Sequence, residues 1–262
     1  MKLSIIKITA IPVLSLGLLM QSCEKKTDIV ATEKTDFSNS SIAQVYIATV
    51  NASRNAVYVD GKVVSGSLLT SGSVFPGSTP GFNVSPGLKA FLVRDTLSTT
   101  TQLPLSFAEN MQFAKSYTVF MYDTITAPKQ KTVETNIIIP SDTTARLRFA
   151  NFVYNPTALP SAFDIFSKKR NAVIFSNVNL TDVTPYIPYA SGVNDTFYIR
   201  PAGTSTNLQN FNPSPAPGAL FDMFATLNPV QKRSYTLVFR GGYRAISTSN
   251  STVRTLSVFT NY

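Results

Sequence analysis

From residue 42 to the end of the chain, short runs rich in Val, Ile, Tyr, Phe and Thr alternate with clusters of Gly, Pro, Asn and Ser. Apolar and β-branched runs bounded by turn residues are typical of β-strands. In the first half they predict strands at Gln44–Val50, Ala56–Val59, Leu88–Val93, Tyr117–Tyr122 and Asn136–Ile139. In the second half they predict strands at Arg146–Phe152, Phe163–Phe166, Thr196–Arg200, Tyr235–Arg240 and Val253–Phe259.

Two local signals add detail to this pattern. Asp60-Gly61 lies between two apolar pairs and predicts a hairpin turn, because glycine adopts positive φ without steric cost. Phe107–Ala114 is the only segment whose composition suggests a short helix.

Several segments of the second half repeat segments of the first half in the same order. Ser-Tyr-Thr followed by an apolar run occurs at Ser116–Phe120 and again at Ser234–Val238. Three further pairs are collinear with it: Ala43–Ala48 with Ala145–Ala150, Ala56–Val59 with Ala162–Ile165, and Pro86–Arg94 with Ala190–Arg200. The alternative is that any two β-domains share such strands, but the common order favours a duplicated domain of about 100 residues.

The pattern therefore predicts an all-β protein with two tandem β-sandwich domains, either immunoglobulin-like or transthyretin-like. The predicted domains span residues 42–140 and 144–262. Residues 23–41 are polar and poor in aromatic residues, which predicts a flexible tether.

The N-terminus predicts export and lipid attachment. Lys2 and Lys7 lie before an apolar run at Ile8–Met20, and Ser22 stands directly before Cys23. This arrangement resembles a bacterial lipoprotein signal of residues 1–22, with Cys23 as the lipidated first residue. The alternative is an ordinary secretory signal that is cut nearby. The apolar run is shorter than the roughly 20 residues that span a bilayer, so we expect a lipid-anchored protein of the cell envelope, at the outer membrane.

Missing residue types limit the chemistry of the folded part. The chain has one cysteine, Cys23, and no histidine. Disulfides, Ser-His-Asp or Cys-His catalysis and histidine-ligated metal sites are therefore excluded. We predict no catalytic residue, no metal site and no cofactor. The remaining enzymatic alternative is a glycoside hydrolase that uses two carboxylates, for which Asp164 and Asp222 are the candidates.

The net charge and the composition of the long loops indicate which kinds of binding partner are possible. The net charge is +9, and loss of residues 1–22 with their two lysines leaves +7. A basic surface suits nucleic acid, anionic lipid or acidic glycan, and export excludes nucleic acid as the expected partner. The long loops Ser65–Pro86 and Gly203–Gly218 carry Phe75, Phe82 and Phe211. These rings could contact a glycan or an envelope protein, although the sequence favours the alternative that they anchor the loops on the core.

The second copy also resembles a known family. Thr144–Phe166, followed by a glycine-led strand and the closing run Ser234–Gly241, resembles the DUF4397 domain of bacterial exported proteins and lipoproteins. The resemblance implies a β-sandwich and an envelope location, and it brings no established activity. We therefore expect an envelope lipoprotein that displays β-sandwiches for binding or scaffolding. The alternative is a structural, fimbria-like subunit, which would need a removable first strand.

Overall fold

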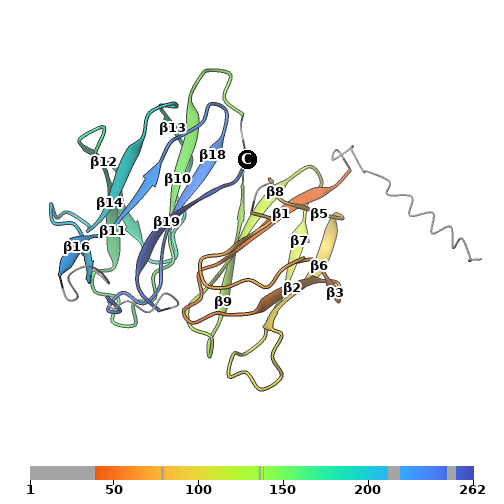
Figure 1. The fold of residues 1–262 in the computed structure, drawn as a ribbon. Coiled ribbons are helices and arrows are strands. Elements are labelled where there is room, and N and C mark those ends of the chain that lie inside the picture. The colour runs from red at the N-terminus through yellow and green to blue at the C-terminus, as the bar shows by residue number, and fades with distance from the viewer. Residues whose placement is uncertain (1–38, 78–79, 136, 138, 212–218, 247–251) are drawn as a thin grey trace, which may run out of the picture. The chain divides into compact units, whose positions relative to one another are not determined.

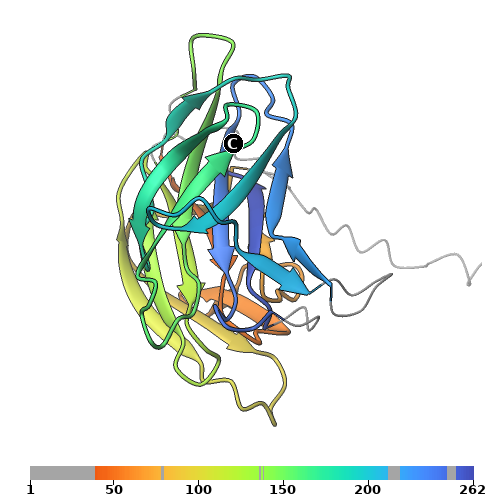
Figure 2. The ribbon, with the colours of Figure 1, turned by 90° about the vertical axis from the view of Figure 1, so that its left-hand side faces the viewer.

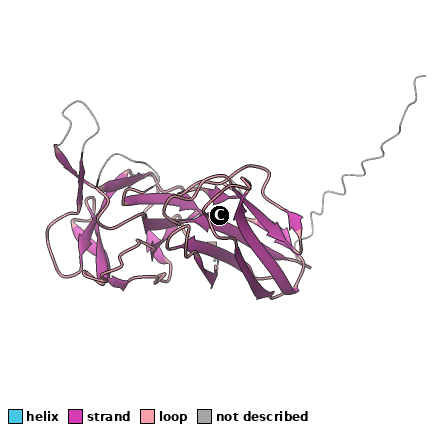
Figure 3. Cartoon of the chain, turned by 90° about the horizontal axis from the view of Figure 1, so that it is seen from below, coloured by secondary structure: helices cyan, strands magenta, loops and turns pink. Residues whose placement is uncertain are grey.

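The computed structural model of this protein describes residues 39–77, 80–135, 137, 139–211, 219–246 and 252–262. The predicted signal segment, Cys23 and nearly all of the tether lie outside these residues. The chain from Asp36 to Tyr262 forms one compact unit. Its described residues form strands and loops and no helix, which confirms the all-β prediction (Figure 3). Accordingly, the described part contains no helix that is long and apolar enough to cross a membrane.

Nine strands lie in the first half of the described chain (Figure 1). They are β1 (Ser41–Ile47), β2 (Asn55–Val59), β3 (Lys62–Val63), β4 (Val74–Phe75), β5 (Phe82–Val84), β6 (Gly87–Asp95), β7 (Leu105–Met111), β8 (Ser116–Tyr122) and β9 (Lys129–Glu134). The second half contains β10 (Ala145–Asn151), β11 (Ala162–Ser167), β12 (Ala172–Asn179), β13 (Ile187–Tyr189), β14 (Asp195–Pro201), β15 (Gln209–Phe211), β16 (Leu220–Asp222), β17 (Phe224–Leu227), β18 (Ser234–Arg240) and β19 (Thr255–Thr260).

Each half contains two sheets with the same strand order. The sheets of the first half are β4-β1-β8-β9, with β5 also paired to β1, and β3-β2-β6-β7. Those of the second half are β13-β10-β18-β19 and β12-β11-β14-β17, and β15 and β16 form a separate hairpin. In both halves the first strand pairs in parallel with the strand that begins Ser-Tyr-Thr, β1 with β8 and β10 with β18. This repetition agrees with duplication, whereas the domain boundaries stay a prediction.

The hydrogen-bond register corrects two of the sequence matches, each by two residues. With Arg94 matched to Arg200, the counterpart of Ala56 is Asp164 and not Ala162, because these residues pair with the two arginines. Ala43 pairs with Tyr117, and the equivalent tyrosine of the second half, Tyr235, pairs with Leu147. The counterpart of Ala43 is therefore Leu147, two residues beyond the Ala145 that the sequence match assigned. Side chains of a strand alternate between two faces, so a shift of two residues leaves every side chain on the same face. A pattern of apolar residues cannot detect such a shift.

Each pair of sheets encloses apolar side chains between its facing surfaces. In the first half, Val45 and Val119 of one sheet pack with Val57 and Val93 of the other. The largest cluster lies in the second half and is lined mainly by rings and branched side chains: Phe149, Phe163, Ile165, Phe197, Ile199, Leu237 and Phe239. Burial of such side chains is the main favourable contribution to folding of a chain without disulfides. The described chain thus has the architecture of a β-sandwich protein, with an apolar cluster between the sheets of each half.

The repeated tyrosine has the same structural role in both halves. The hydroxyl of Tyr117 accepts a hydrogen bond from the backbone N–H of Gln112, at 3.1 Å. The hydroxyl of Tyr235 accepts one from the backbone N–H of Val230, at 3.0 Å. Both tyrosines begin a central strand and bond the backbone five residues upstream, as in the tyrosine corner of immunoglobulin-like domains. The Ser-Tyr-Thr repeat therefore reports a fold constraint.

The two local sequence signals had opposite outcomes. Asp60 and Gly61 have φ of 49° and 77° and connect β2 to β3, which confirms the predicted hairpin turn. The predicted helix at Phe107–Ala114 is wrong, because this segment lies largely in β7. Its side chains alternate between half-buried and exposed, the two-residue period of a strand, and pairing with β6 overrides the helix-favouring composition. Of the predicted strand at Asn136–Ile139, residues 136 and 138 lie outside the described residues, and Ile137 and Ile139 belong to no strand.

A third apolar cluster joins one sheet of the first half to one sheet of the second. Tyr46 and Phe120 pack there with Phe152 and Phe259. Beside them Arg148 is almost fully buried, and its Nε donates a hydrogen bond to Thr236 at 2.8 Å. Its Nη2 donates to the hydroxyls of Thr118 and Thr135, at 3.1 and 3.4 Å, and burial lowers the pKa of the guanidinium. The contact between the halves is therefore a packed interface with a polar centre.

The position of β1 bears on the fimbria-like alternative. This strand is hydrogen-bonded to β8 on one side and to β4 and β5 on the other. Six of its seven residues are buried, and its side chains contribute to the core of the first half and to the contact between the halves. Removal of β1 would expose both clusters, so the structure does not favour a removable first strand.

Candidate binding face

The outer sheet of the second half, β12-β11-β14-β17, carries rings on the side that faces away from the core. This sheet is toward the viewer in Figure 2. Along β11 and β14, alternate side chains point into the core, and these include Ile165 and Phe197, which are fully buried. Phe166 and Tyr198 stand at the other positions and are only half-buried. Alternation along these strands therefore places two aromatic side chains on the outer surface.

The strand register aligns the outer residues into a row. Phe166 of β11 is paired with Val173 of β12 and with Tyr198 of β14, and Tyr198 is paired with Phe224 of β17. Paired residues of neighbouring strands have side chains in contact range on the same face of the sheet. The rings of Tyr198 and Phe224 are 6.3 Å apart between centroids and inclined by 60°. Phe224 is 48% exposed, so the row is accessible to a ligand.

An arginine and a carboxylate border this row. The guanidinium of Arg200 lies 3.8 Å from the centroid of the Phe166 ring, a cation–π contact. Its Nε donates a hydrogen bond to the side chain of Asn207 at 2.7 Å. Among the described residues, the two Nη groups of Arg200 have no hydrogen-bond acceptor. They remain available to an acceptor on a ligand.

Asp222 is held in place by two amide side chains. Asn207 donates to one carboxylate oxygen at 2.7 Å, and Gln209 donates to the other at 2.9 Å. These hydrogen bonds lower the pKa of Asp222, and Arg200 adds a smaller effect in the same direction. Each carboxylate oxygen can accept a further hydrogen bond. We call Phe166, Tyr198, Phe224, Arg200 and Asp222 the aromatic face.

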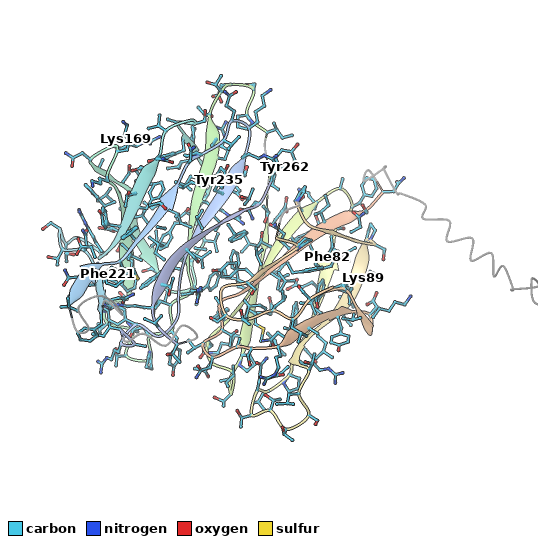
Figure 4. All side chains as sticks on the ribbon, in the orientation of Figure 1. Phe82, Lys89, Lys169, Phe221, Tyr235 and Tyr262 are labelled. Carbon is cyan, nitrogen blue, oxygen red and sulfur yellow. The ribbon has the colours of Figure 1, made fainter. Side chains whose placement is uncertain are left out.

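Further apolar side chains lie on the neighbouring hairpin. Phe211 of β15 is paired with Leu220 of β16, and the two are 36% and 53% exposed. Phe221, also partly exposed, lies at the outer margin of the second half in Figure 4. Exposed apolar side chains that gather on adjacent strands are a sign of an interaction surface.

The phenylalanines that the sequence singled out have different positions. Phe75 and Phe82 are partly buried and pack against the core of the first half, with ring centroids 5.4 Å apart, as loop anchors do. Phe82 lies within the body of the first half in Figure 4. Phe211 is more exposed and lies in the hairpin described above. Their contact with a ligand stays a prediction, and Cys23 lies outside the described residues.

The two candidate catalytic carboxylates have separate hydrogen-bond partners. Asp164 is buried and accepts hydrogen bonds from the backbone N–H groups of Asn177 and Gly203, at 2.6 and 2.9 Å. Asp222 is bound by Asn207 and Gln209, and its lowered pKa keeps it ionised. A general acid for glycoside hydrolysis needs a raised pKa. The lowered pKa of Asp222 is therefore the opposite of what a general acid requires. In the described part of the chain, no three Asp, Glu, Cys or His side chains gather as a metal site would require.

The sequence reasoning missed most of the aromatic face. Phe166, Tyr198 and Arg200 lie within predicted strands, and each stands two residues from a neighbour on the same face. This alternation was a usable signal for outward rings. The signal for Phe224 was weaker, because β17 was not predicted.

Comparison with known proteins adds little to this geometry. No protein-family model matches the chain, so the resemblance to DUF4397 is not supported by a family match. The search among curated proteins gives no match either. One similar solved structure is that of a "putative cell adhesion protein" from Bacteroides eggerthii DSM 20697, with 8% identity over 85% of this chain and 96% of that chain. Its TM-score of 0.19 is too low to carry an argument about this chain. What the structure defines is a β-sandwich protein with an exposed aromatic face.

Proposed function

We propose that this protein binds carbohydrate through the aromatic face, and that lipid on Cys23 holds it in the cell envelope. The observation that carries the binding proposal is the row of Phe166, Tyr198 and Phe224 beside the ordered side chains of Arg200 and Asp222. A sugar ring has an apolar face of C–H groups and an edge of hydroxyls. The aromatic face offers a partner for each.

The spacing of the rings suits an extended glycan. Neighbouring strands are about 4.8 Å apart, which is close to the length of one sugar ring. A linear chain lying across β11, β14 and β17 could therefore meet, with successive sugars, the Arg200 guanidinium stacked on Phe166, then Tyr198, then Phe224. Tyr198 and Phe224 are inclined to each other, so the contacts would alternate between ring faces and ring edges.

The polar side chains are prepared for hydrogen bonds to hydroxyls. The carboxylate of Asp222 accepts from hydroxyl groups, and the guanidinium of Arg200 donates to them. Because Asn207 and Gln209 already fix Asp222, binding loses little side-chain entropy there. A sugar presents hydroxyl donors and acceptors beside an apolar ring face, so one small unit pairs with both the polar side chains and the rings. We therefore prefer carbohydrate over an envelope protein as the ligand.

The binding test uses the chain from residue 23 onward with Cys23→Ala, on an array of neutral and anionic glycans. Phe224→Ala and Asp222→Ala should each weaken binding about 5- to 30-fold, the effect of losing about 1–2 kcal/mol at a central contact. Phe113→Ala is the matched control, because Phe113 is 55% exposed in the first half, outside the aromatic face. Equal binding by all three variants, or binding to envelope proteins and to no glycan, would refute the proposal.

The anchoring part of the proposal has its own test. Export through residues 1–22 followed by lipid attachment predicts that the wild-type protein labels with radioactive palmitate and sediments with membranes. Cys23→Ala should abolish the label and release the protein into the soluble fraction. Sedimentation of Cys23→Ala with membranes at the wild-type level would show that a lipid on Cys23 is not the anchor.

A non-catalytic role is part of the proposal. Two backbone N–H groups bind the carboxylate of Asp164, and hydrogen bonds from two amide side chains lower the pKa of Asp222 and keep it ionised. Incubation with the glycans that bind should therefore leave their chain length unchanged. Release of shorter sugars by the wild-type protein, with loss of that release in Asp222→Asn, would assign it an enzymatic role.

A further inference from the structure

The outer sheet of the first half repeats the layout of the aromatic face. Its strands β3, β2, β6 and β7 correspond to β12, β11, β14 and β17. In each sheet, the residues that pair from one strand to the next form a row across the sheet. The row of the first half is Val63, Tyr58, Leu92 and Ser106, and that of the second half is Val173, Phe166, Tyr198 and Phe224.

The stacked arginine is also repeated. Arg94 lies over the ring of Tyr58, 5.1 Å from its centroid, as Arg200 lies over Phe166. In each half the arginine is paired with the residue two positions before the ring, Ala56 in the first half and Asp164 in the second. Arg94 is exposed, and its guanidinium has no hydrogen-bond acceptor among the described residues. The pair of ring and guanidinium is therefore present on both outer sheets.

The two rows differ at their ends. Ser106 stands where the second half has Phe224, and Pro104, two residues before it, corresponds to Asp222. The small serine leaves space that Phe224 fills in the other half. A groove of about 570 Å³ lies at this place, lined by Leu92, Arg94, Leu97, Thr100, Pro104 and Ser106 among others. Ligand sites in proteins have volumes of about 300–1,000 Å³.

The wall of this groove is fixed by a buried carboxylate. Asp95 is 8% exposed and accepts hydrogen bonds from the backbone N–H of Leu97 and the hydroxyl of Thr100, at 2.9 and 3.0 Å. It also forms an ion pair with Arg54 at 2.9 Å. These bonds fix the loop that closes the groove, and Leu97 on it remains 46% exposed. A prearranged wall lowers the entropy lost on binding.

We infer that this β6–β7 groove is a second carbohydrate site. It binds the end of a glycan, whereas the aromatic face binds an extended chain. The inference rests on the proposed function. Leu92 and Leu97 offer apolar contacts to the face of a terminal sugar, and Arg94 and Ser106 offer hydrogen bonds to its hydroxyls. A ring-shaped ligand would occupy the space that the Phe224 ring occupies in the second half. Two sites on one chain raise the avidity for a polysaccharide without any new contact at either site.

The test is calorimetric titration of the chain from residue 23 onward, carrying Cys23→Ala, with cellohexaose as a neutral probe and hexagalacturonate as an anionic one. With the probe that binds, we expect two sites per chain. Arg94→Ala should weaken the groove site and Phe224→Ala the aromatic face, each by about 5- to 30-fold with the other site unchanged, and the double variant should weaken both. Phe113→Ala is the control and should keep both sites. Methyl NMR signals of Leu92 and Leu97 should shift on titration, and Arg94→Ala should reduce these shifts at least tenfold.

The outcomes separate the two proposals. A single site that Phe224→Ala weakens and Arg94→Ala leaves intact would overturn the groove and keep the aromatic face. A single site that Arg94→Ala weakens and Phe224→Ala leaves intact would support the groove and refute the aromatic face. No binding of either probe, with no shift of the leucine methyl signals, would count against both.

Discussion

Asp195 gives the sharpest stability prediction, because its carboxylate is almost fully buried and joins four donors. It is 4% exposed and accepts hydrogen bonds from the hydroxyls of Ser167 and Tyr189. Its other oxygen accepts the backbone N–H groups of Lys169 and Thr196, at 2.8 and 2.7 Å. Burial raises the pKa of Asp195, but these hydrogen bonds outweigh burial and lower it overall. The ionised form is therefore part of the folded structure.

The cost of Asp195→Asn follows from this geometry. An amide oxygen can keep the two backbone N–H bonds, but an NH₂ group then faces the hydroxyls of Ser167 and Tyr189, which must turn to accept. Hydrogen bonds to a charged group contribute about 1 kcal/mol more than neutral ones, so two of them give a loss of about 2 kcal/mol. Asp195→Ala leaves all four donors without this acceptor, and we expect about 4 kcal/mol. For a chain of this size the Asn variant should lower Tm by about 4–8 °C.

The assay is thermal unfolding followed by circular dichroism at several pH values. The pKa of Asp195 is lower in the folded than in the unfolded state, so its contribution is present above the unfolded pKa of about 3.9 and is lost as pH falls below it. The difference between wild type and Asp195→Asn should therefore shrink below about pH 4. Asp142→Asn is the control, since Asp142 also accepts two hydrogen bonds but is exposed, where solvent replaces them, so its Tm loss should be well below that of Asp195→Asn. If Asp195→Asn lowers Tm at pH 7 by no more than Asp142→Asn does, the reasoning is refuted.

The same cluster predicts an alkaline limit. Burial, together with the hydrogen bond to Asp195, raises the pKa of Tyr189 from its ordinary value of 10.0 to about 12. A raised pKa contributes stability that is complete below pH 10 and lost between pH 10 and about 12. Tyr189→Phe should remove most of this pH dependence. An unchanged slope of Tm against pH in that range would assign the alkaline loss to other groups.

The remaining predictions concern the repeated corners and the glycines. Tyr235→Phe should cost about 1–2 kcal/mol and Tyr117→Phe less, because Tyr235 is 7% exposed and Tyr117 is half-buried. Equal losses in urea unfolding would contradict this order. Gly241→Ala should cost more than about 3 kcal/mol, since an added Cβ would lie 2.1 Å from the carbonyl oxygen of Val253 at a φ of +85°. Gly61→Ala has a similar φ but open space, so about 1 kcal/mol is expected. Similar losses for both would show that φ alone decides.

Strands with a buried face could be predicted from the sequence, and edge strands could not. β1, β8, β10 and β18 lie in the middle of their sheets and read as apolar runs. β9, with the sequence Lys-Gln-Lys-Thr-Val-Glu, is an edge strand whose side chains are exposed or half-buried. Its strand character comes from pairing with β8, a partner that local composition does not reveal.

The binding face could be predicted only in part for a related reason. Phe166 and Tyr198 stand at outward positions of predicted strands, so alternation could have found each of them alone. Their assembly into one row with Phe224 depends on the registers between β11, β14 and β17, which are contacts over 26 residues or more. The loop phenylalanines drew attention in the sequence because polar residues surround them. Phe75 and Phe82 instead pack on the core, where an apolar side chain among polar neighbours anchors a long loop.

Comparison of equivalent positions in the two halves separates fold from function within one chain. Positions that keep their residue type maintain the fold, as Tyr117 and Tyr235 do through the same hydrogen bond. Positions that differ while the backbone stays the same are free of that constraint. Ser106 and Phe224 form such a pair, because both lie on the outer face at the same register. If the outer faces only shielded the cores, exchanging these two residues would leave binding unchanged, whereas our proposals require Ser106→Phe to close the groove and Phe224→Ser to weaken the aromatic face.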